Sequence, residues 1–235
     1  MTEQVQKAYT KVDIHKEAVN ALRTNIQFFS YDQGLKILAV TSAYSGEGKS
    51  TTAISLAESF ALTGIKVLVL NADMRKPSIH KLLDVQSNQG LTNLLLKRNT
   101  LEEVVVESNG VDYLLTGPIP PNPSELLGSR AMMTLLEDLK EEYDLILIDT
   151  PPVGLFTDAV ILSPMVDGYV IICSQGQTRK EELLEVISSL EQVHANILGV
   201  VLNRVVQKSG THYGKYGKYG KYGKYGKYGK YGSSK

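Results

Sequence analysis

The chain has 235 residues, 43% of them hydrophobic, which is enough for one domain or at most two and excludes an intrinsically disordered protein. Its formal net charge of zero hides an uneven distribution, because residues 1–206 carry 17 basic and 25 acidic residues, whereas residues 207–235 carry eight lysines and no acid. The single cysteine, Cys173, excludes a disulfide framework and a cysteine-based metal cluster, and it favours a reducing, cytoplasmic environment.

Hydropathy limits the ways in which the chain can contact a membrane. No apolar run reaches the roughly 20 residues that a transmembrane helix needs, and the polar first 13 residues lack the apolar core of a signal peptide. We therefore expect membrane association only through a partner protein or through the basic C-terminal segment. We expect no nucleic-acid partner.

The first predicted element is an amphipathic helix over residues 14–29, and an alternation of strands and helices follows it. The helix is predicted because apolar residues recur at three- and four-residue spacing. These residues are Ile14, Ala18, Leu22, Ile26 and Phe29. Short apolar runs predict six strands, at residues 36–41, 66–72, 111–116, 144–149, 168–173 and 197–203. Helical patterns fill residues 50–62, 130–142 and 179–194.

Several of these strand runs are apolar at consecutive positions instead of alternate ones. Both faces of such strands should be covered by helices, which is typical of a parallel sheet. The order of elements therefore predicts an α/β fold with a doubly wound, mainly parallel sheet. The segment 118–123 contains four prolines and predicts a loop at the rim, because proline fits neither a helix interior nor a central strand.

The C-terminal segment is a low-complexity repeat. Six Tyr-Gly-Lys triplets begin at Tyr213 and are followed by Tyr231 and Gly232. With nothing apolar to pack against, residues 207–235 are predicted to be a disordered, flexible, tyrosine-rich tail beside a domain of residues 1–206, and a flexible chain of about 25 residues spans roughly 25 to 30 Å. The tail is either a bland solubilising segment or a substrate for multiple phosphorylation. The candidate acceptors are Tyr213, Tyr216, Tyr219, Tyr222, Tyr225, Tyr228 and Tyr231.

The segment AYSGEGKST, which follows the first predicted strand and opens a helix, has the pattern of a phosphate-binding P-loop, except that Ala43 replaces the usual first glycine. The glycines let backbone N–H groups surround a phosphate, and the helix N-terminus adds a positive end. Lys49 should reach the terminal phosphates, and the Ser50 hydroxyl should bind Mg²⁺. The predicted nucleotide-binding residues of the loop are Ser45, Gly46, Glu47, Gly48, Lys49, Ser50 and Thr51.

Two aspartates follow predicted strands whose carboxyl ends should meet beside this loop. Asp149 ends the run LILID, and Asp73 follows KVLVLNA, so both are candidate Mg²⁺ ligands and catalytic acids, with loop capping as the alternative role. Asn203, with Arg204 behind it, ends the last strand and is predicted to bind the nucleotide base, although a turn-forming asparagine explains it nearly as well.

The segments AYSGEGKST, NADMRKP, PPNPSELL, DLILIDTPP and GVVLNR, in this order, resemble the cytoplasmic bacterial protein-tyrosine kinases of capsule and exopolysaccharide synthesis. The resemblance covers residues 16–204. It implies a P-loop NTPase fold related to the septum-positioning and partitioning ATPases, with ATP and Mg²⁺ as cofactors. Lys49, Asp73 and Asp149 are then catalytic, and Ser50, Asp73 and Asp149 hold the metal.

The same resemblance implies a regulatory setting. From it we expect the chain to phosphorylate the tyrosine cluster of its own tail in trans and to regulate the polymerisation and export of a polysaccharide. We further expect homo-oligomers, a place at the inner face of the membrane through a transmembrane co-polymerase adaptor, and a cognate tyrosine phosphatase. The helix motif linked to ring assembly in the family appears as Glu17, Asn20 and Arg23, with asparagine in place of the middle arginine.

Two further classes of function remain open. The chain could be an ATP-hydrolysing dimerisation switch of the partitioning type, but Tyr44 occupies the position of the signature lysine of that branch. It could also be a scaffold whose basic tail binds anionic lipid or polymer. A eukaryotic-type kinase fold is excluded, because the sequence contains no HRD or DFG triplet.

Overall fold

The computed structural model describes residues 3–86 and 88–206, with side chains described for residues 14–29, 34–86 and 88–206. A seven-stranded sheet has the order β3-β4-β2-β5-β1-β6-β7, and all neighbouring strands in it are parallel except the antiparallel pair β3 and β4. The strands are β1 (Ile37–Ser42), β2 (Val67–Asn71), β3 (Val105–Ser108), β4 (Val111–Leu114), β5 (Leu145–Asp149), β6 (Gly168–Ser174) and β7 (Ile197–Asn203). This confirms the predicted α/β class and mainly parallel sheet.

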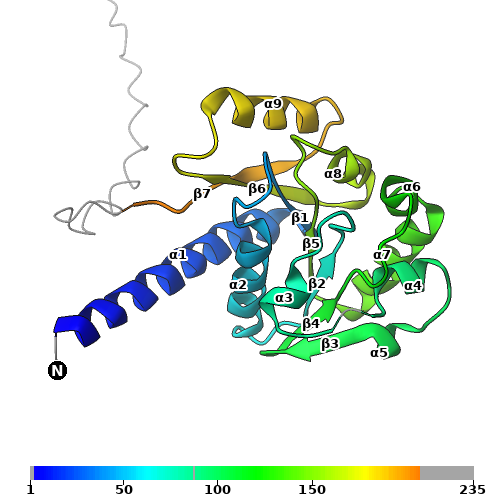
Figure 1. The fold of residues 1–235 in the computed structure, drawn as a ribbon, viewed down its shortest axis with the longest axis horizontal. Coiled ribbons are helices and arrows are strands. Elements are labelled where there is room, and N and C mark those ends of the chain that lie inside the picture. The colour runs from blue at the N-terminus through cyan, green and yellow to red at the C-terminus, as the bar shows by residue number, and fades with distance from the viewer. Residues whose placement is uncertain (1–2, 87, 207–235) are drawn as a thin grey trace, which may run out of the picture. The chain divides into compact units, whose positions relative to one another are not determined.

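The helices connect the strands and cover the sheet (Figure 1). They are α1 (Glu3–Gln33), α2 (Lys49–Ala61), α3 (Ile79–Leu82), α4 (Leu91–Leu95), α5 (Leu101–Val104), α6 (Pro123–Leu127), α7 (Arg130–Glu142), α8 (Asp158–Ile161) and α9 (Lys180–Glu191), with a 3-10 turn η1 (Ser163–Met165). In the part of the chain that the structure describes, no helix is both long enough and apolar enough to cross a bilayer.

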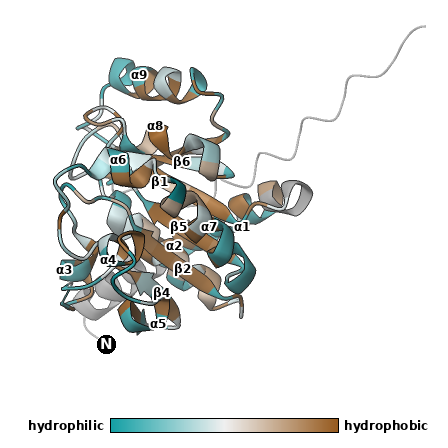
Figure 2. Cartoon of the chain, turned by 90° about the vertical axis from the view of Figure 1, so that its right-hand side faces the viewer, coloured by the Kyte–Doolittle hydropathy of each residue, from teal (hydrophilic) through white to brown (hydrophobic). Residues whose placement is uncertain are grey.

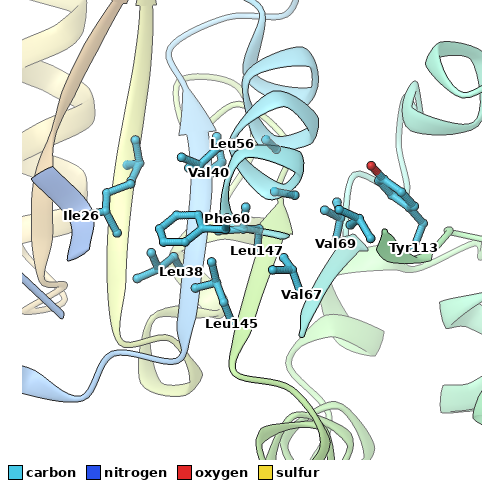
Figure 3. Packing of buried hydrophobic residues seen from close by; sticks show 14 of the residues in the cluster. Ile26, Leu38, Val40, Leu56, Phe60, Val67, Val69, Tyr113, Leu145 and Leu147 are labelled. Atoms are coloured by element: carbon cyan, nitrogen blue, oxygen red, sulfur yellow. The ribbon is translucent and has the colours of Figure 1, made fainter. Parts of the chain in front are cut away.

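Both faces of the central strands β1, β2, β5 and β6 are buried, as their consecutive apolar residues predict. On β2, Val67 and Val69 pack with α2, whereas Leu68 and Leu70 pack with α7 (Figure 3 shows the α2 side). Figure 2 shows that the strands at the centre of the sheet are hydrophobic. Full burial of one such aliphatic side chain contributes about 1.5 to 3 kcal/mol, so the central strands hold the site rigidly.

Our strand prediction located β4 but missed β3, with which β4 forms an antiparallel hairpin. Its two-residue turn is formed by Asn109 and Gly110, which have φ values of 53° and 75°. This Asn-Gly pair is the preferred turn of a tight hairpin, because both residues tolerate positive φ. The pair, together with the β-branched Val105 and Val106 before it, was a readable signal for a strand.

Helix α1 is longer than predicted, running from Glu3 to Gln33 instead of over residues 14–29, and it packs on α2. Its predicted apolar stripe is only partly buried. Ile26 lies in the core and Leu22 packs against it, but Ala18 and Phe29 are exposed. Ala18 and Phe29 belong to the predicted apolar face but not to the buried face of the helix, so the prediction was wrong there.

The proline-rich segment is irregular up to Asn122, as predicted, but Pro123 is the first residue of α6. Proline is favoured at this position because the first helical N–H has no partner within the helix. The compact unit of the structure ends at Arg204. The predicted disordered tail, residues 207–235, lies outside the described residues.

Candidate nucleotide-binding and catalytic site

The predicted P-loop connects the end of β1 with the first turn of α2. Gly46 and Gly48 have φ values of 85° and 94°, in the left-handed region that glycine tolerates best. Helix α2 then begins at Lys49, so the loop ends in the free N–H groups of a helix N-terminus. Such a loop and helix end form a binding site for an anionic phosphate group.

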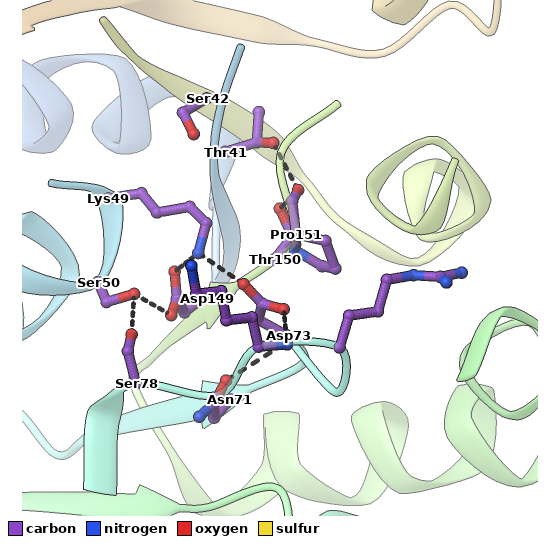
Figure 4. Close-up of polar contacts among 12 residues, drawn as sticks. Thr41, Ser42, Lys49, Ser50, Asn71, Asp73, Ser78, Asp149, Thr150 and Pro151 are labelled. Atoms are coloured by element: carbon purple, nitrogen blue, oxygen red, sulfur yellow. Dashed lines mark hydrogen bonds and ion pairs between the residues drawn. The ribbon is translucent and has the colours of Figure 1, made fainter. Parts of the chain in front are cut away.

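Four predicted site residues meet directly beside this loop (Figure 4). The ammonium Nζ of Lys49 donates to Asp73 Oδ2 at 2.9 Å and lies 3.5 Å from Asp149 Oδ1, which is an ion-pair distance. The hydroxyl of Ser50 donates to Asp149 Oδ2 at 2.6 Å. The register of the sheet explains the meeting, because Asn71 at the end of β2 lies opposite Asp149 at the end of β5.

All four side chains are buried, so their charges interact strongly. Burial alone lowers the pKa of Lys49, but the carboxylates of Asp149 and Asp73 outweigh burial and hold this pKa above its ordinary value. Burial raises the pKa of Asp149, while Lys49 and the Ser50 hydroxyl act in the opposite direction. The site therefore keeps a cationic lysine between two acidic groups.

Comparison with known proteins identifies the chain. A family model described as an AAA domain matches residues 35–201. The tyrosine-protein kinase YwqD of Bacillus subtilis is 41% identical over 203 residues, which cover 86% of each chain. The chain belongs to the bacterial tyrosine-protein kinases. The solved kinase domain of the Escherichia coli tyrosine kinase ETK is 34% identical with a TM-score of 0.80, and the match covers 84% of this chain and 78% of that one.

A more distant structural match establishes the fold alone. The septum site-determining protein MinD from Pyrococcus horikoshii, solved with Mg-ADP, has a TM-score of 0.62 at 24% identity, and the match covers 74% of this chain and 72% of that one. The kinase thus has the P-loop NTPase fold of the partitioning-ATPase-related class, as the resemblance implied.

Asp73 and Asp149, which we call the acidic pair, fit a magnesium ion that also binds nucleotide phosphates. Within the described residues, no group of three or more His, Cys, Asp or Glu side chains is arranged to hold a metal. However, Mg²⁺ in phosphate-transfer sites usually takes only one or two carboxylates and completes its shell with phosphate oxygens and water. Asp149 Oδ1 is buried and lacks a hydrogen-bond partner, so it can serve as such a ligand.

Sequence reasoning missed two polar residues of this site. Ser78, at the start of α3, donates its hydroxyl to Ser50 Oγ at 2.9 Å. Asn71 accepts the Asp73 N–H at 3.2 Å, and its buried Nδ2 has no hydrogen-bond partner. Asn71 stands in the NADMRKP segment two residues before Asp73, so its place at a strand end was the available signal.

Arg75 of the same segment forms a structural ion pair beside the site. Its Nε donates to Asp158 Oδ2 at 2.7 Å, and its guanidinium lies 4.3 Å from the ring centroid of Phe156. The Ser124 hydroxyl also donates to Asp158, at 2.9 Å. These contacts join the β2–α3 connection to α6 and α8 and hold the chain that follows Asp73.

The structure places Asn203 and Arg204 beside the P-loop, where their side-chain donors contact its backbone, and the contact of Asn203 with the nucleotide base stays a prediction. Asn203 Nδ2 donates to the Glu47 carbonyl at 2.8 Å, and Arg204 Nη2 donates to the Gly46 carbonyl at 2.6 Å. The Glu47 carboxylate is buried, accepts the Tyr44 N–H at 2.8 Å and also bonds the Thr178 hydroxyl. Thr51 is an exposed residue of the first turn of α2.

Two of the three residues expected to mediate assembly contact α2 of the same chain. Arg23 Nη1 donates to the Ser59 carbonyl at 2.6 Å, and Asn20 Oδ1 accepts from the Ser59 hydroxyl at 2.9 Å. Glu17 is exposed. The seven candidate acceptor tyrosines, Tyr213 to Tyr231, lie outside the described residues.

Proposed function

We propose that this tyrosine kinase binds Mg·ATP at the P-loop and transfers the γ-phosphoryl group to tyrosines of its own C-terminal tail on a neighbouring copy. The observation that carries the proposal is the buried triad of Lys49, Asp73 and Asp149 at the mouth of a phosphate-binding loop. Phosphoryl transfer depends mainly on positioning and on stabilisation of phosphate charge, and this triad can supply both.

In the proposed reaction, the tyrosine oxygen attacks the γ-phosphorus while the bond from that phosphorus to the ADP oxygen breaks. Lys49 exchanges a carboxylate partner for phosphate oxygens and stabilises their negative charge. The proton of the tyrosine hydroxyl passes to Asp73 or Asp149. The products are ADP and phosphotyrosine.

Ser50, Asp73 and Asp149 hold the magnesium ion in this proposal. The ion supplies charge neutralisation on the phosphate oxygens. The Ser50 hydroxyl, which donates to Asp149 at 2.6 Å and accepts from Ser78 at 2.9 Å, would supply an oxygen ligand to the ion. Ser45, Gly46, Glu47, Gly48 and Thr51 contribute the surrounding loop and first helical turn.

The proposal is tested by following the label of γ-labelled ATP. Label on protein tyrosine supports a kinase whose acceptor is its own chain. Label found only in free phosphate would favour the alternative, an ATP-hydrolysing dimerisation switch of the partitioning type. The MinD-like fold is compatible with either reaction, so the fate of the label decides between them.

We expect the phosphate to appear on the tail tyrosines and not on the tyrosines of the core. Tyr113, Tyr143 and Tyr169 are buried, and burial raises the pKa of each hydroxyl. They cannot reach a second active site without unfolding. Mass spectrometry after incubation with Mg·ATP should locate the phosphate on residues 213–231, and the variant with all seven tail tyrosines changed to Phe should lose incorporation.

Phosphate found mainly on Tyr9, Tyr31 or Tyr143, with the repeat unmodified, would contradict this assignment.

Each phosphate adds about −1.5 to −2 charges, so four or five cancel the eight lysines of the tail and seven make it strongly negative. We propose that this change of sign loosens subunit contacts and detaches the kinase from a membrane adaptor.

We propose that α1 takes part in self-association and that Glu17 is its contact residue. Arg23 and Asn20 already bond α2 of their own chain, so an exposed Glu17 is better placed to pair with a basic group of a neighbouring copy. Light scattering of Glu17→Lys should show a smaller average mass than the unchanged chain. The control Glu137→Lys alters an exposed glutamate on α7 and should leave the mass unchanged.

The tail variant with seven Phe residues gives the sharper negative test of assembly, because it cannot be phosphorylated there. If it stays monomeric at every concentration with ATP and an adaptor fragment present, self-association is refuted.

We propose the wider setting from the resemblance. The chain is a cytoplasmic enzyme that a transmembrane co-polymerase adaptor holds at the inner face of the membrane, and a cognate tyrosine phosphatase resets it. It regulates the polymerisation and export of a capsular polysaccharide.

A further inference from the structure

The outer side of the P-loop is held by side chains from two distant segments. We call these side chains the clamp: Gln177 and Thr178, which follow β6, and Asn203 and Arg204, at the end of β7. The two segments are themselves joined, because the Gln175 N–H donates to the Asn203 carbonyl at 2.9 Å.

Two contacts of the clamp reach consecutive carbonyl groups of the loop. Arg204 Nη2 donates to the Gly46 carbonyl at 2.6 Å, and Asn203 Nδ2 donates to the Glu47 carbonyl at 2.8 Å. A bond from a charged guanidinium is among the stronger hydrogen bonds in proteins. The orientation of two successive peptide groups is therefore fixed from one side.

Gln177 and Thr178 brace these contacts. Arg204 Nη1 donates to Gln177 Oε1 at 3.3 Å, and Gln177 Nε2 approaches the Ser45 carbonyl at 3.4 Å. The Thr178 hydroxyl bonds the Glu47 carboxylate, which is fully buried. The clamp thus contacts the Glu47 side chain as well as the backbone of the loop.

The backbone around the clamp is shaped for a close approach. A Cβ atom at Gly48 would lie 2.2 Å from Asn203 Nδ2, so only glycine permits this contact. Arg204 has a φ of 55°, which is uncommon for a residue other than glycine, and its N–H donates to Asn203 Oδ1 at 2.8 Å. Strain of this kind persists only where surrounding contacts over-determine it.

Peptide geometry connects the clamp to phosphate binding. In a planar trans peptide the C=O of one residue and the N–H of the next point in opposite directions. Holding the carbonyls of Gly46 and Glu47 outward therefore aims the N–H groups of Glu47 and Gly48 toward the interior of the loop. Inward N–H groups are the donors with which such a loop binds an anion.

We infer that Asn203 and Arg204 are positioning residues that pre-organise the P-loop for the phosphate chain of the nucleotide, whatever base it carries. This inference rests on the proposed function, in which the loop binds ATP. It assigns to Asn203 a role different from the predicted contact with the base.

The test compares full-length kinase with Asn203→Ala and Arg204→Ala, using calorimetric titration with Mg²⁺ and either ATP or inorganic tripolyphosphate, which has no base. We expect both variants to bind both ligands roughly tenfold more weakly, the usual effect of losing one charge-assisted or buried hydrogen bond. KM for ATP should rise by a similar factor, with a smaller change in kcat. Arg204→Lys, which keeps a donor and the charge, should recover part of the affinity, and Arg98→Ala, an exposed arginine, should bind as the unchanged chain does.

The outcomes separate the two proposals. If Asn203→Ala weakens ATP but not tripolyphosphate, its contact is to the base and the inference is overturned. Unchanged affinity for both ligands in both variants overturns it as well. If the unchanged chain binds neither ligand, the proposed function fails and takes the inference with it. Melting temperatures measured without ligand identify a variant that has unfolded. If Arg204→Ala has unfolded, the affinity of Arg204→Lys is compared with that of the unchanged chain instead.

Discussion

Lys49→Met is expected to abolish tyrosine phosphorylation while the fold persists. The lysine ammonium is the cationic group between Asp73 and Asp149, and methionine has a similar length but no charge. Loss of one preorganised charge at a transferring phosphoryl group lowers the rate by about 100- to 1,000-fold. Immunoblotting for phosphotyrosine after incubation with Mg·ATP measures the effect.

The control for this variant is Lys81→Met, which removes an exposed lysine of α3. It should retain full activity. Lys49→Met also leaves two buried carboxylates without their cation, and removal of one partner of a buried pair is destabilising. We therefore expect a lower melting temperature but a cooperative transition, and Lys49→Met with normal phosphotyrosine would refute the loop as the ATP site.

Asp73→Asn and Asp149→Asn are each expected to lower the rate of phosphoryl transfer by about 100-fold or more, since each removes a negatively charged oxygen ligand from the proposed magnesium site. Asparagine keeps the shape of the side chain, so a loss of rate reports on charge. Initial rates measured over a series of Mg²⁺ concentrations test the prediction.

Asp84→Asn is the matched control for both variants. Asp84 is exposed and has a φ of 54°, a conformation that asparagine also tolerates, so its fold and rate should be unchanged. An Asp73→Asn or Asp149→Asn enzyme that kept the normal rate at millimolar Mg²⁺ would show that this aspartate is a structural cap.

The sequence predicted those parts of the structure that depend on short patterns. Runs of consecutive apolar residues located the parallel strands β1, β2, β5 and β6, because burial on both faces leaves a signal that needs no partner to be read. The glycines and Lys49 located the loop, because this pattern is also local and can be read without knowledge of distant segments. Asp73 and Asp149 could be paired because parallel strands end at one edge of the sheet.

Contacts that depend on distant segments were not readable. Asn203 follows the P-loop by more than 150 residues, so its bond to the Glu47 carbonyl could not be inferred from spacing. Similarly, the apolar period of α1 did not reveal that Phe29 is exposed, because only the position of α2 decides which face is covered. The short helices α3 to α6 and α8 have four or five residues each, too few for a helical period to appear.

The position of β7 in the sheet has a consequence for local stability. Among the described strands, β1 and β5 each have neighbours on both sides, whereas β7 pairs with β6 alone and exposes Val200 and Leu202. An edge strand with half-exposed side chains can open without unfolding of the whole domain, and such openings require less free energy than global unfolding. Because Asn203 and Arg204 lie at the end of this strand, we expect the support of the nucleotide loop to open more readily than the acidic pair, Asp73 and Asp149, which lie at or just beyond the ends of the central strands β2 and β5.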